Sequence, residues 1–196
     1  DKKRPLLEEV ERISNLANFV FVRQKGPYGN GTPLLNVRHL IDKEPFIYMW
    51  SDDFIAATPS RTKQLLKTYK QYGCSCLSAW RAKSDKDYTK YGFAGGQEIE
   101  PGILDVTSTI EKPGKNKAPS DLAYGSGFIF TPEIFKYLDD RLNQLAKGEE
   151  LYYNDLFEPM IKDGNRILAV EIKNGKYYDT GNKLEYMKTV VEFGLK

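Results

Sequence analysis

The sequence predicts an α/β fold with a mixed β-sheet. In the first half of the chain, helical and strand patterns alternate, as in the helix expected from Thr58-Pro59 to Tyr72 and the strand expected at residues 74–81. In the second half, several strand patterns follow one another without a helix between them. Alternation is typical of parallel crossover units, whereas successive strands favour antiparallel pairing, so one sheet would contain both. No internal repeat is visible, and residues 1–196 are expected to form a single domain.

The elements of the first half begin with an amphipathic helix at residues 4–17. Leu7, Val10 and Ile13 recur there at a helical spacing. Thr32 and Pro33 place a capping residue before a proline at the first helical position, which starts a second helix. The remaining elements are a strand at residues 19–23, a glycine-rich loop at 24–31, the body of the second helix at 34–40 and an aromatic strand at 46–50.

The second half is expected to be rich in strands. Strands are predicted at residues 91–94, 103–111 and 122–130, separated by Gly95-Gly96 and by a polar loop. Asn174-Gly175 is the strongest hairpin signal in the chain and predicts that strands at 167–172 and 176–179 pair with each other. The helices expected here run from Thr131-Pro132 to about residue 146, from Asn154 as a cap over 155–162, and over 183–193.

Composition and charge exclude several classes of protein. A formal net charge of +2, from 29 basic and 27 acidic residues, offers no electrostatic footprint for nucleic acid or a membrane surface. No apolar run approaches the length of a membrane span, and residues 1–5 lead into no signal-peptide core. Cys74 and Cys76 share one face of a predicted strand and are poorly placed to bond each other, so we expect reduced core or interface thiols. These features predict a soluble, cytoplasmic protein.

Two carboxylates, Asp52 and Asp53, follow the predicted strand at residues 46–50. Ligands of open α/β sheets bind outside the carboxyl ends of the strands, and an acidic side chain there can hold Mg²⁺ against a phosphate. The alternative is a solvated turn that caps the next helix. On this stretch alone, the alternative is favoured.

Four loops that follow predicted strands carry residues suited to one kind of ligand. They are residues 24–31, Asp52-Asp53, Glu111-Lys112-Pro113 and Asp179-Thr180-Gly181. If the sheet brings them together, the pocket holds separated carboxylates, a lysine, an amide and glycines, which suits a phosphate-rich ligand with a divalent cation. Taken singly, Glu111-Lys112 is also explained as a surface ion pair and Asp179 to Asn182 as a helix cap.

His39 is the only histidine, which leaves little scope for acid–base or nucleophilic catalysis. The sequence around it predicts a position on a helix surface or a partly buried position.

Short motifs also occur in a fixed order along nearly the whole chain. They are Arg23-Gln24-Lys25, Gly29-Asn30-Gly31, Ser51-Asp52-Asp53, Tyr91-Gly92-Phe93, Glu111-Lys112-Pro113, Ala118-Pro119-Ser120, Tyr178-Asp179-Thr180-Gly181 and Lys183-Leu184. In this order the chain resembles the bacterial UTP–glucose-1-phosphate uridylyltransferases, or UDP-glucose pyrophosphorylases. The resemblance implies a Rossmann-like nucleotide-diphospho-sugar transferase fold with a mixed β-sheet. It also implies UTP and glucose 1-phosphate as substrates and Mg²⁺ as the cofactor.

The resemblance implies substrate-binding roles for four residues. Gln24 and Gly29 match positions that read the uracil ring, the first through its side-chain amide and the second through its backbone. Gly92 and Glu111 match positions around the glucose hydroxyls.

The resemblance also implies a catalytic set of three residues. Lys112 matches the lysine that meets the sugar phosphate, and Asp52 and Asp179 match the carboxylates that hold Mg²⁺. The sugar phosphate would attack the α-phosphorus of UTP in line, with Lys112 and the metal neutralising the approaching charges.

The family begins with a strand and a Gly-x-Gly-Thr-Arg loop that wraps the triphosphate, and this sequence contains neither. We therefore expect the chain to be N-terminally incomplete relative to the family. It would be a fragment, or a chain completed by another chain, or a fold that compensates for the missing part in another way. The competing hypotheses are a thymidylyl- or cytidylyltransferase, a non-catalytic sugar-nucleotide binding module, and a structural oligomerisation piece. The last is suggested by the exposed-looking aromatics Tyr152, Tyr153 and Phe193. Family members commonly form dimers or tetramers, so a homo-oligomer is expected.

Overall fold

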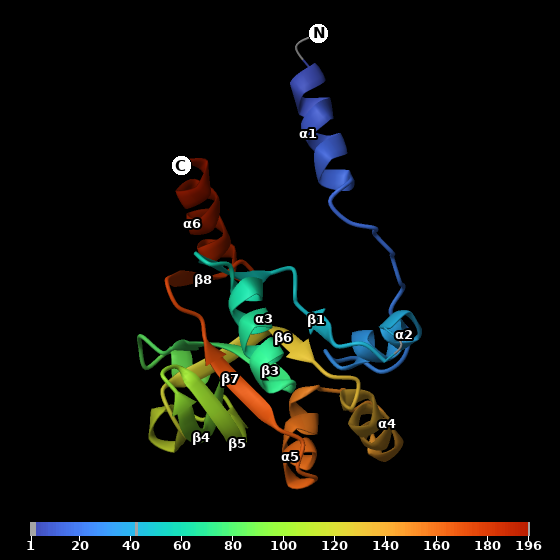
Figure 1. Cartoon of the computed structure of the whole chain (residues 1–196), viewed down its shortest axis with the longest axis vertical. Coiled ribbons are helices and arrows are strands. Elements are labelled where there is room, and N and C mark those ends of the chain that lie inside the picture. Colours follow the sequence, from blue (N-terminus) through green and yellow to red (C-terminus); the bar gives the residue numbers. More distant parts are fainter. Residues whose placement is uncertain (1–2, 42, 196) are drawn as a thin grey trace.

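A mixed six-stranded sheet is the centre of the fold in the computed structural model, which describes residues 3–41 and 43–195 (Figure 1). The strand order is β1-β6-β3-β7-β5-β4, and β6 also pairs with β4. Its strands are β1 (Phe46–Tyr48), β3 (Ser75–Arg81), β4 (Gly92–Glu100), β5 (Ile103–Glu111), β6 (Leu122–Phe130) and β7 (Ile167–Glu171). The β3–β7 pair is parallel and the other pairs are antiparallel, which confirms the predicted mixed sheet. The domain limits predicted at Asp1 and Lys196 lie outside the described residues.

A second, two-stranded sheet joins β2 (Asp53–Ala57) to β8 (Gly175–Asp179) in antiparallel register. The hairpin predicted at Asn174-Gly175 is therefore wrong, because β8 pairs with β2 instead of β7. β7 already has β3 on one side and β5 on the other, so it has no free edge to offer. The chain only bends here, with Asn174 in a left-handed conformation (φ 52°), and passes from the large sheet to the small one.

The helices occur where the sequence predicts them. They are α1 (Arg4–Ser14), α2 (Thr32–Ile41), α3 (Arg61–Tyr72), α4 (Ile134–Gln144), α5 (Asn154–Lys162) and α6 (Lys183–Gly194), with short 3₁₀ turns at Asp87–Thr89 and Lys115–Lys117. α3 begins after Ser60, whose hydroxyl accepts a hydrogen bond from the Lys63 N–H at 3.4 Å. None of the helices in the described part of the chain combines the length and apolar character needed to cross a bilayer.

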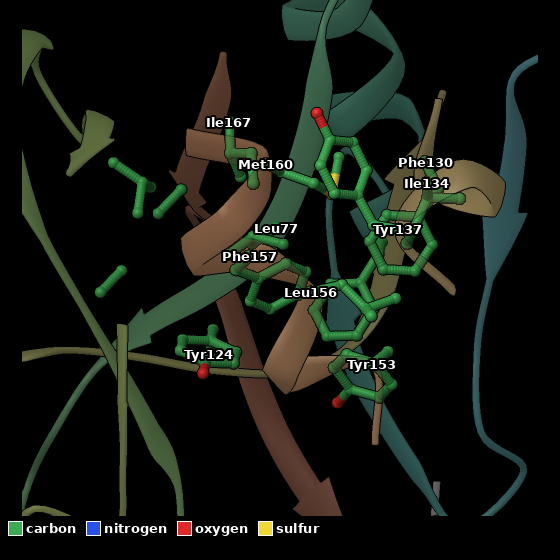
Figure 2. Packing of buried hydrophobic residues seen from close by; sticks show 14 of the residues in the cluster. Leu77, Tyr124, Phe130, Ile134, Tyr137, Tyr153, Leu156, Phe157, Met160 and Ile167 are labelled. Atoms are coloured by element: carbon green, nitrogen blue, oxygen red, sulfur yellow. The ribbon is translucent and has the colours of Figure 1, made fainter. Parts of the chain in front are cut away.

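The main core lies between the large sheet and the helices α4 and α5. Phe128 and Phe130 of β6 meet Tyr153 and Phe157 in a cluster of tilted and edge-on rings. Figure 2 shows Phe130, Tyr153 and Phe157 of this cluster. Tyr153 is only 2% exposed, so its expected place on the surface is wrong. Its ring packs inside the core, whereas the adjacent Tyr152 is 42% exposed, and two neighbouring tyrosines in the sequence do not reveal which of them is buried.

Both cysteines are free and buried, as expected for core thiols. They belong to a second cluster, with Leu65 and Ile129, on the other face of the sheet from α5. His39 is exposed on α2, in agreement with its predicted surface position.

The N-terminal segment stands apart from the rest of the fold (Figure 1). α1 contains no buried residue, so the apolar stripe of Leu7, Val10 and Ile13 is exposed. The strand predicted at residues 19–23 is wrong: this stretch forms no strand, and Phe21 is 95% exposed. β-branched and aromatic residues favour strands only where a neighbouring strand satisfies their backbone groups, and none in the described residues pairs with this segment.

Candidate active site

A cavity of about 540 Å³ opens between the end of the small sheet and one end of the large sheet. It brings together five residues predicted to form the site: Asp52, Gly92, Glu111, Lys112 and Asp179. The rest of its lining is Asn30, Trp50, Asp53, Lys90, Tyr91, Tyr124, Gly125, Tyr152, Tyr153, Asn154, Asp155 and Tyr177. Beyond Lys112 and Asp179 it continues into a shallow hollow of about 410 Å³, which also includes Asn182.

The carboxylates of Asp52 and Asp179 are brought together by the pairing of β2 with β8. Asp53 lies opposite Asp179, so Asp52 faces the turn that follows β8. The Thr180 N–H and hydroxyl both donate to the Asp52 carbonyl at 2.7 Å. Asp52 Oδ2 and Asp179 Oδ1 lie 2.9 and 3.4 Å from the point that a Cβ of Gly181 would occupy. The missing side chain at Gly181 therefore leaves the space between the two carboxylates open.

The donor set at this point suits a hard divalent cation. Carboxylate oxygens are the ligands that Mg²⁺ prefers, and Mg²⁺ usually binds through one or two carboxylates together with substrate phosphates and water. Within residues 3–41 and 43–195, no three His, Cys, Asp or Glu side chains gather as a metal site. Asp52 and Asp179 would therefore need further oxygen ligands, such as substrate phosphates and water, to hold a cation.

Lys112 leaves β5 in an unusual backbone conformation. Its φ is 47°, in the left-handed region, and its N–H donates to the Tyr91 carbonyl at 3.1 Å. Non-glycine residues are held in this region only where the surrounding structure enforces it, and such strain clusters at functional sites. The Lys112 amine lies 3.9 Å from Glu111, and the two side chains are 59% and 48% exposed, so this ion pair is weak.

Glu111 and Gly92 face each other across the β4–β5 pair. A Cβ on Gly92 would lie 2.4 Å from Tyr124 Cζ and 2.9 Å from Glu111 Oε2, so only glycine fits between these two side chains. Burial raises the pKa of Glu111, and the nearby Lys112 amine opposes that rise.

Asn154 is a site residue whose place the sequence did not reveal. It was expected to cap α5, but it is the first residue of the helix, and the N-cap position belongs to Tyr153, whose side chain makes no capping hydrogen bond. The Asn154 amide donates to Glu111 Oε2 at 3.0 Å and to the Tyr124 hydroxyl at 3.3 Å. Burial raises the pKa of Tyr124, and the neighbouring Glu111 carboxylate adds to the rise. From the sequence, a polar side chain at a helix start is predicted to be a cap, because its actual partners lie on strands 30 and 43 residues away.

Asp53 behaves differently from its neighbour Asp52. It is 6% exposed, and it accepts hydrogen bonds from the Ser126 N–H and hydroxyl and, at 3.3 Å, from the Tyr177 hydroxyl. The Arg61 guanidinium lies 3.6 Å away. Burial raises the pKa of Asp53, and these partners oppose the rise. Asp53 therefore joins β2 to β6, β8 and α3, while Asp52 remains exposed at the cavity.

Gln24 and Gly29 do not line the cavity. Gln24 is exposed in an extended segment, and Gly29 (φ 115°) packs so closely on Leu151 that a Cβ would lie 2.2 Å from its carbonyl oxygen. The same loop reaches the cavity through Asn30, whose side-chain oxygen accepts the Tyr153 N–H at 3.0 Å. The uracil-reading roles of Gln24 and Gly29 stay predictions.

The chain is similar to known nucleotide-sugar enzymes along almost its whole length. The nucleotidyl transferase family matches residues 2–193. The UTP–glucose-1-phosphate uridylyltransferases of Bacillus subtilis and Staphylococcus epidermidis are each 33% identical over 194 residues, which is 99% of this chain. The chain spans 65% and 66% of the length of these two relatives, slightly less than two thirds.

Solved structures give the same result for the fold. A UDP-glucose pyrophosphorylase complexed with UDP-glucose superposes with a TM-score of 0.84 at 31% identity, over 98% of this chain and 72% of that one. A UTP-bound enzyme from Acinetobacter baumannii superposes with a TM-score of 0.85 over 99% of this chain and 66% of that one. Its identity is 22%, so it supports the fold alone.

Proposed function

Because this chain belongs to the nucleotidyl transferase family, we propose that it transfers the uridylyl group of UTP to glucose 1-phosphate, forming UDP-glucose and pyrophosphate. Curated relatives with this activity in their names are 33% identical over 99% of the chain. The observation that carries the proposal is the convergence of Asp52, Asp179, Glu111 and Lys112, which are distant in sequence, on one cavity.

The acceptor phosphate needs no general base. Its second pKa is about 6, so it is largely doubly ionised at neutral pH. One of its oxygens forms a bond to the α-phosphorus of UTP, and the bond from that phosphorus to the pyrophosphate oxygen breaks. The cavity lining includes no histidine, since His39 is exposed on α2. The chemical difficulty is the approach of two anions, and the site must supply positive charge.

We assign Lys112 as the residue that supplies this positive charge. Its backbone conformation places the side chain at the mouth of the cavity, beside Asp179 and Tyr91. Glu111 and the backbone of Gly92 would hold the glucose hydroxyls, with Asn154 fixing the position of the Glu111 carboxylate. Gln24 and Gly29 are assigned to the uracil ring.

Asp52 and Asp179 would hold Mg²⁺. Both carboxylates flank the space beside Gly181 and line the cavity, as in the two-carboxylate sites in which Mg²⁺ meets phosphates. When bound, the cation supplies further charge neutralisation to the triphosphate.

The test is the release of pyrophosphate by the protein across UTP, dTTP and CTP, paired with glucose 1-phosphate and other sugar phosphates, with and without Mg²⁺. We expect the highest kcat/KM for UTP with glucose 1-phosphate and no turnover without the cation. A preference for dTTP or CTP would reassign the nucleotide. Binding of UDP-glucose in a calorimeter without turnover would instead favour a non-catalytic binding module.

We also propose that residues 1–196 act as one domain within a homo-oligomer. α6 exposes several large apolar side chains, Leu184, Met187, Val190 and Val191 among them, and contiguous apolar surface marks interfaces. Static light scattering should give the mass of a dimer or tetramer. A monomeric mass over a wide concentration range would contradict this expectation.

A further inference from the structure

A wall of three aromatic rings separates the substrate cavity from a second cavity. The ring of Tyr177 stacks on Trp80 with centroids 4.0 Å apart and an angle of 13°. Tyr91 meets both rings edge-on, at 5.2 Å from Trp80 and 5.5 Å from Tyr177. Tyr91 and Tyr177 line the substrate cavity, and all three rings line a neighbouring cavity of about 370 Å³. The two cavities therefore share this aromatic wall.

The position of the wall is set from several elements. Gly125 of β6 has no side chain, and a Cβ there would lie 2.7 Å from Trp80 Cη2, so the indole rests directly on the strand. The Tyr177 hydroxyl donates to Asp53 at 3.3 Å. Burial and the Asp53 carboxylate both raise the pKa of Tyr177, so this hydroxyl stays protonated as a donor. The Tyr91 carbonyl accepts the Lys112 N–H, which ties the wall to the residue assigned to the sugar phosphate.

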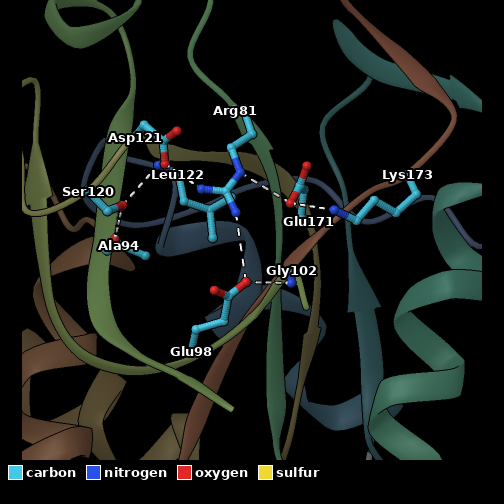
Figure 3. Close-up of polar contacts among 9 residues, drawn as sticks. All are labelled: Arg81, Ala94, Glu98, Gly102, Ser120, Asp121, Leu122, Glu171 and Lys173. Carbon is cyan, nitrogen blue, oxygen red and sulfur yellow. Dashed lines mark hydrogen bonds and ion pairs between the residues drawn. The ribbon is translucent and has the colours of Figure 1, made fainter. Parts of the chain in front are cut away.

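Three cations line the second cavity, and two of them are paired with carboxylates. Arg81 lies 2.6 Å from Asp121 and 3.2 Å from Glu171, and Lys173 lies 2.6 Å from Glu171 (Figure 3). The third, Lys83, shares the lining with Asp87, whose carboxylate accepts the Lys83 backbone N–H at 2.7 Å. Because carboxylates stand beside these cations, the space behind the wall suits an uncharged group better than a free phosphate.

We propose that Tyr177, supported by Trp80, determines the size of the sugar that the site accepts by closing the substrate cavity off from the second cavity. This inference rests on the proposed function, because it concerns the sugar of the same reaction. The wall stands beside Lys112 and Gly92, so a bulky neutral substituent on the sugar meets the Tyr177 ring. Shortening Tyr177 joins the two cavities and provides room for that substituent.

The experiment compares the dissociation constants of UDP-glucose and UDP-N-acetylglucosamine, measured by calorimetry with the full chain. We expect the native protein to favour UDP-glucose by at least ~10-fold, which is within the discrimination that a pocket wall provides. In Tyr177→Ala this preference should fall by at least ~10-fold, whereas Tyr177→Phe, which retains the ring, should stay within ~2-fold of the native ratio. Tyr88→Ala is the matched control, because Tyr88 stacks on Phe93 at 4.5 Å and lines neither cavity.

Each outcome decides between the two proposals. If a folded Tyr177→Ala protein keeps the native ratio of the two dissociation constants, or if Tyr177→Phe changes this ratio as much as Tyr177→Ala does, the role of the wall is overturned. The proposed function is then left intact. If circular dichroism shows that Tyr177→Ala does not fold, Tyr177→Val, which suits a strand, is judged by the same criterion. A native protein that binds neither UDP-sugar overturns the proposed function, and this inference with it.

Discussion

Replacing Lys112 separates its chemical contribution from its contribution to the fold. Its side chain is 59% exposed and its ion pair with Glu111 spans 3.9 Å, so the pair stabilises the fold by at most about 1 kcal/mol. A charge partner in the transition state contributes far more, since a loss of ~100-fold in turnover corresponds to about 2.7 kcal/mol. We therefore expect Lys112→Ala to lower kcat by at least ~100-fold with little change in the urea midpoint.

The left-handed backbone at residue 112 provides a second, independent variant. Alanine bears the same strain as lysine at a φ of 47°, whereas glycine does not. Lys112→Gly should lose as much turnover as Lys112→Ala. Its free energy of unfolding, measured with urea, should nevertheless exceed that of Lys112→Ala by roughly 0.5–1 kcal/mol. A Lys112→Gly protein that loses turnover but gains stability would show that the native protein keeps a strained backbone at residue 112 for catalysis.

The assay is steady-state pyrophosphate release at saturating UTP and Mg²⁺, with Lys117→Ala as the control. Lys117 is an exposed lysine in the loop that follows β5, and it does not line the cavity. Near-native kcat in both Lys112 variants would remove Lys112 from the mechanism. A large loss in Lys117→Ala would show that the general positive charge of the loop matters instead.

Three further predictions concern the rest of the site. Gly92→Ala places a Cβ 2.4 Å from Tyr124. This change should raise the KM for glucose 1-phosphate at least ~10-fold and leave the KM for UTP within ~2-fold. Equal changes in the two KM values would argue against a role of Gly92 in binding the sugar. Asp52→Asn and Asp179→Asn should each raise the Mg²⁺ concentration needed for half-maximal turnover, and an unchanged Mg²⁺ titration would exclude the residue concerned as a ligand. The raised pKa of Asp53 means that the folded state binds its proton more tightly than the unfolded state, so Asp53 costs stability as the pH rises above about 4. Urea unfolding between pH 3 and 7 should therefore show that the free energy of unfolding of Asp53→Asn increases relative to that of the native protein as the pH rises. A relative decrease would contradict the raised pKa of Asp53.

Local signals in the sequence were sufficient for the helices. Thr32-Pro33 starts α2, and Asn182 caps α6 by accepting the Leu184 N–H at 2.9 Å. These signals act within a few residues, so they need no knowledge of the fold. The strands were located less well, and β4 continues past the predicted break at Gly95-Gly96 to Glu100. The register shift between the two glycines lets Gly96 pass so close to β5 that a Cβ would lie 1.9 Å from the Asp105 carbonyl oxygen.

The sequence by itself determined which residues are candidates for the chemistry, because Asp52, Lys112 and Asp179 stand in motifs whose order along the chain resembles that of one enzyme family. Only the tertiary structure decided their arrangement: β2 pairs with β8 across more than a hundred residues, and Asn154 and Tyr177 turn toward the site. Pairing partners of strands and the direction of long-range hydrogen bonds depend on which edges and polar groups remain unsatisfied after the rest of the chain has packed. That competition is global, and no window of neighbouring residues contains it.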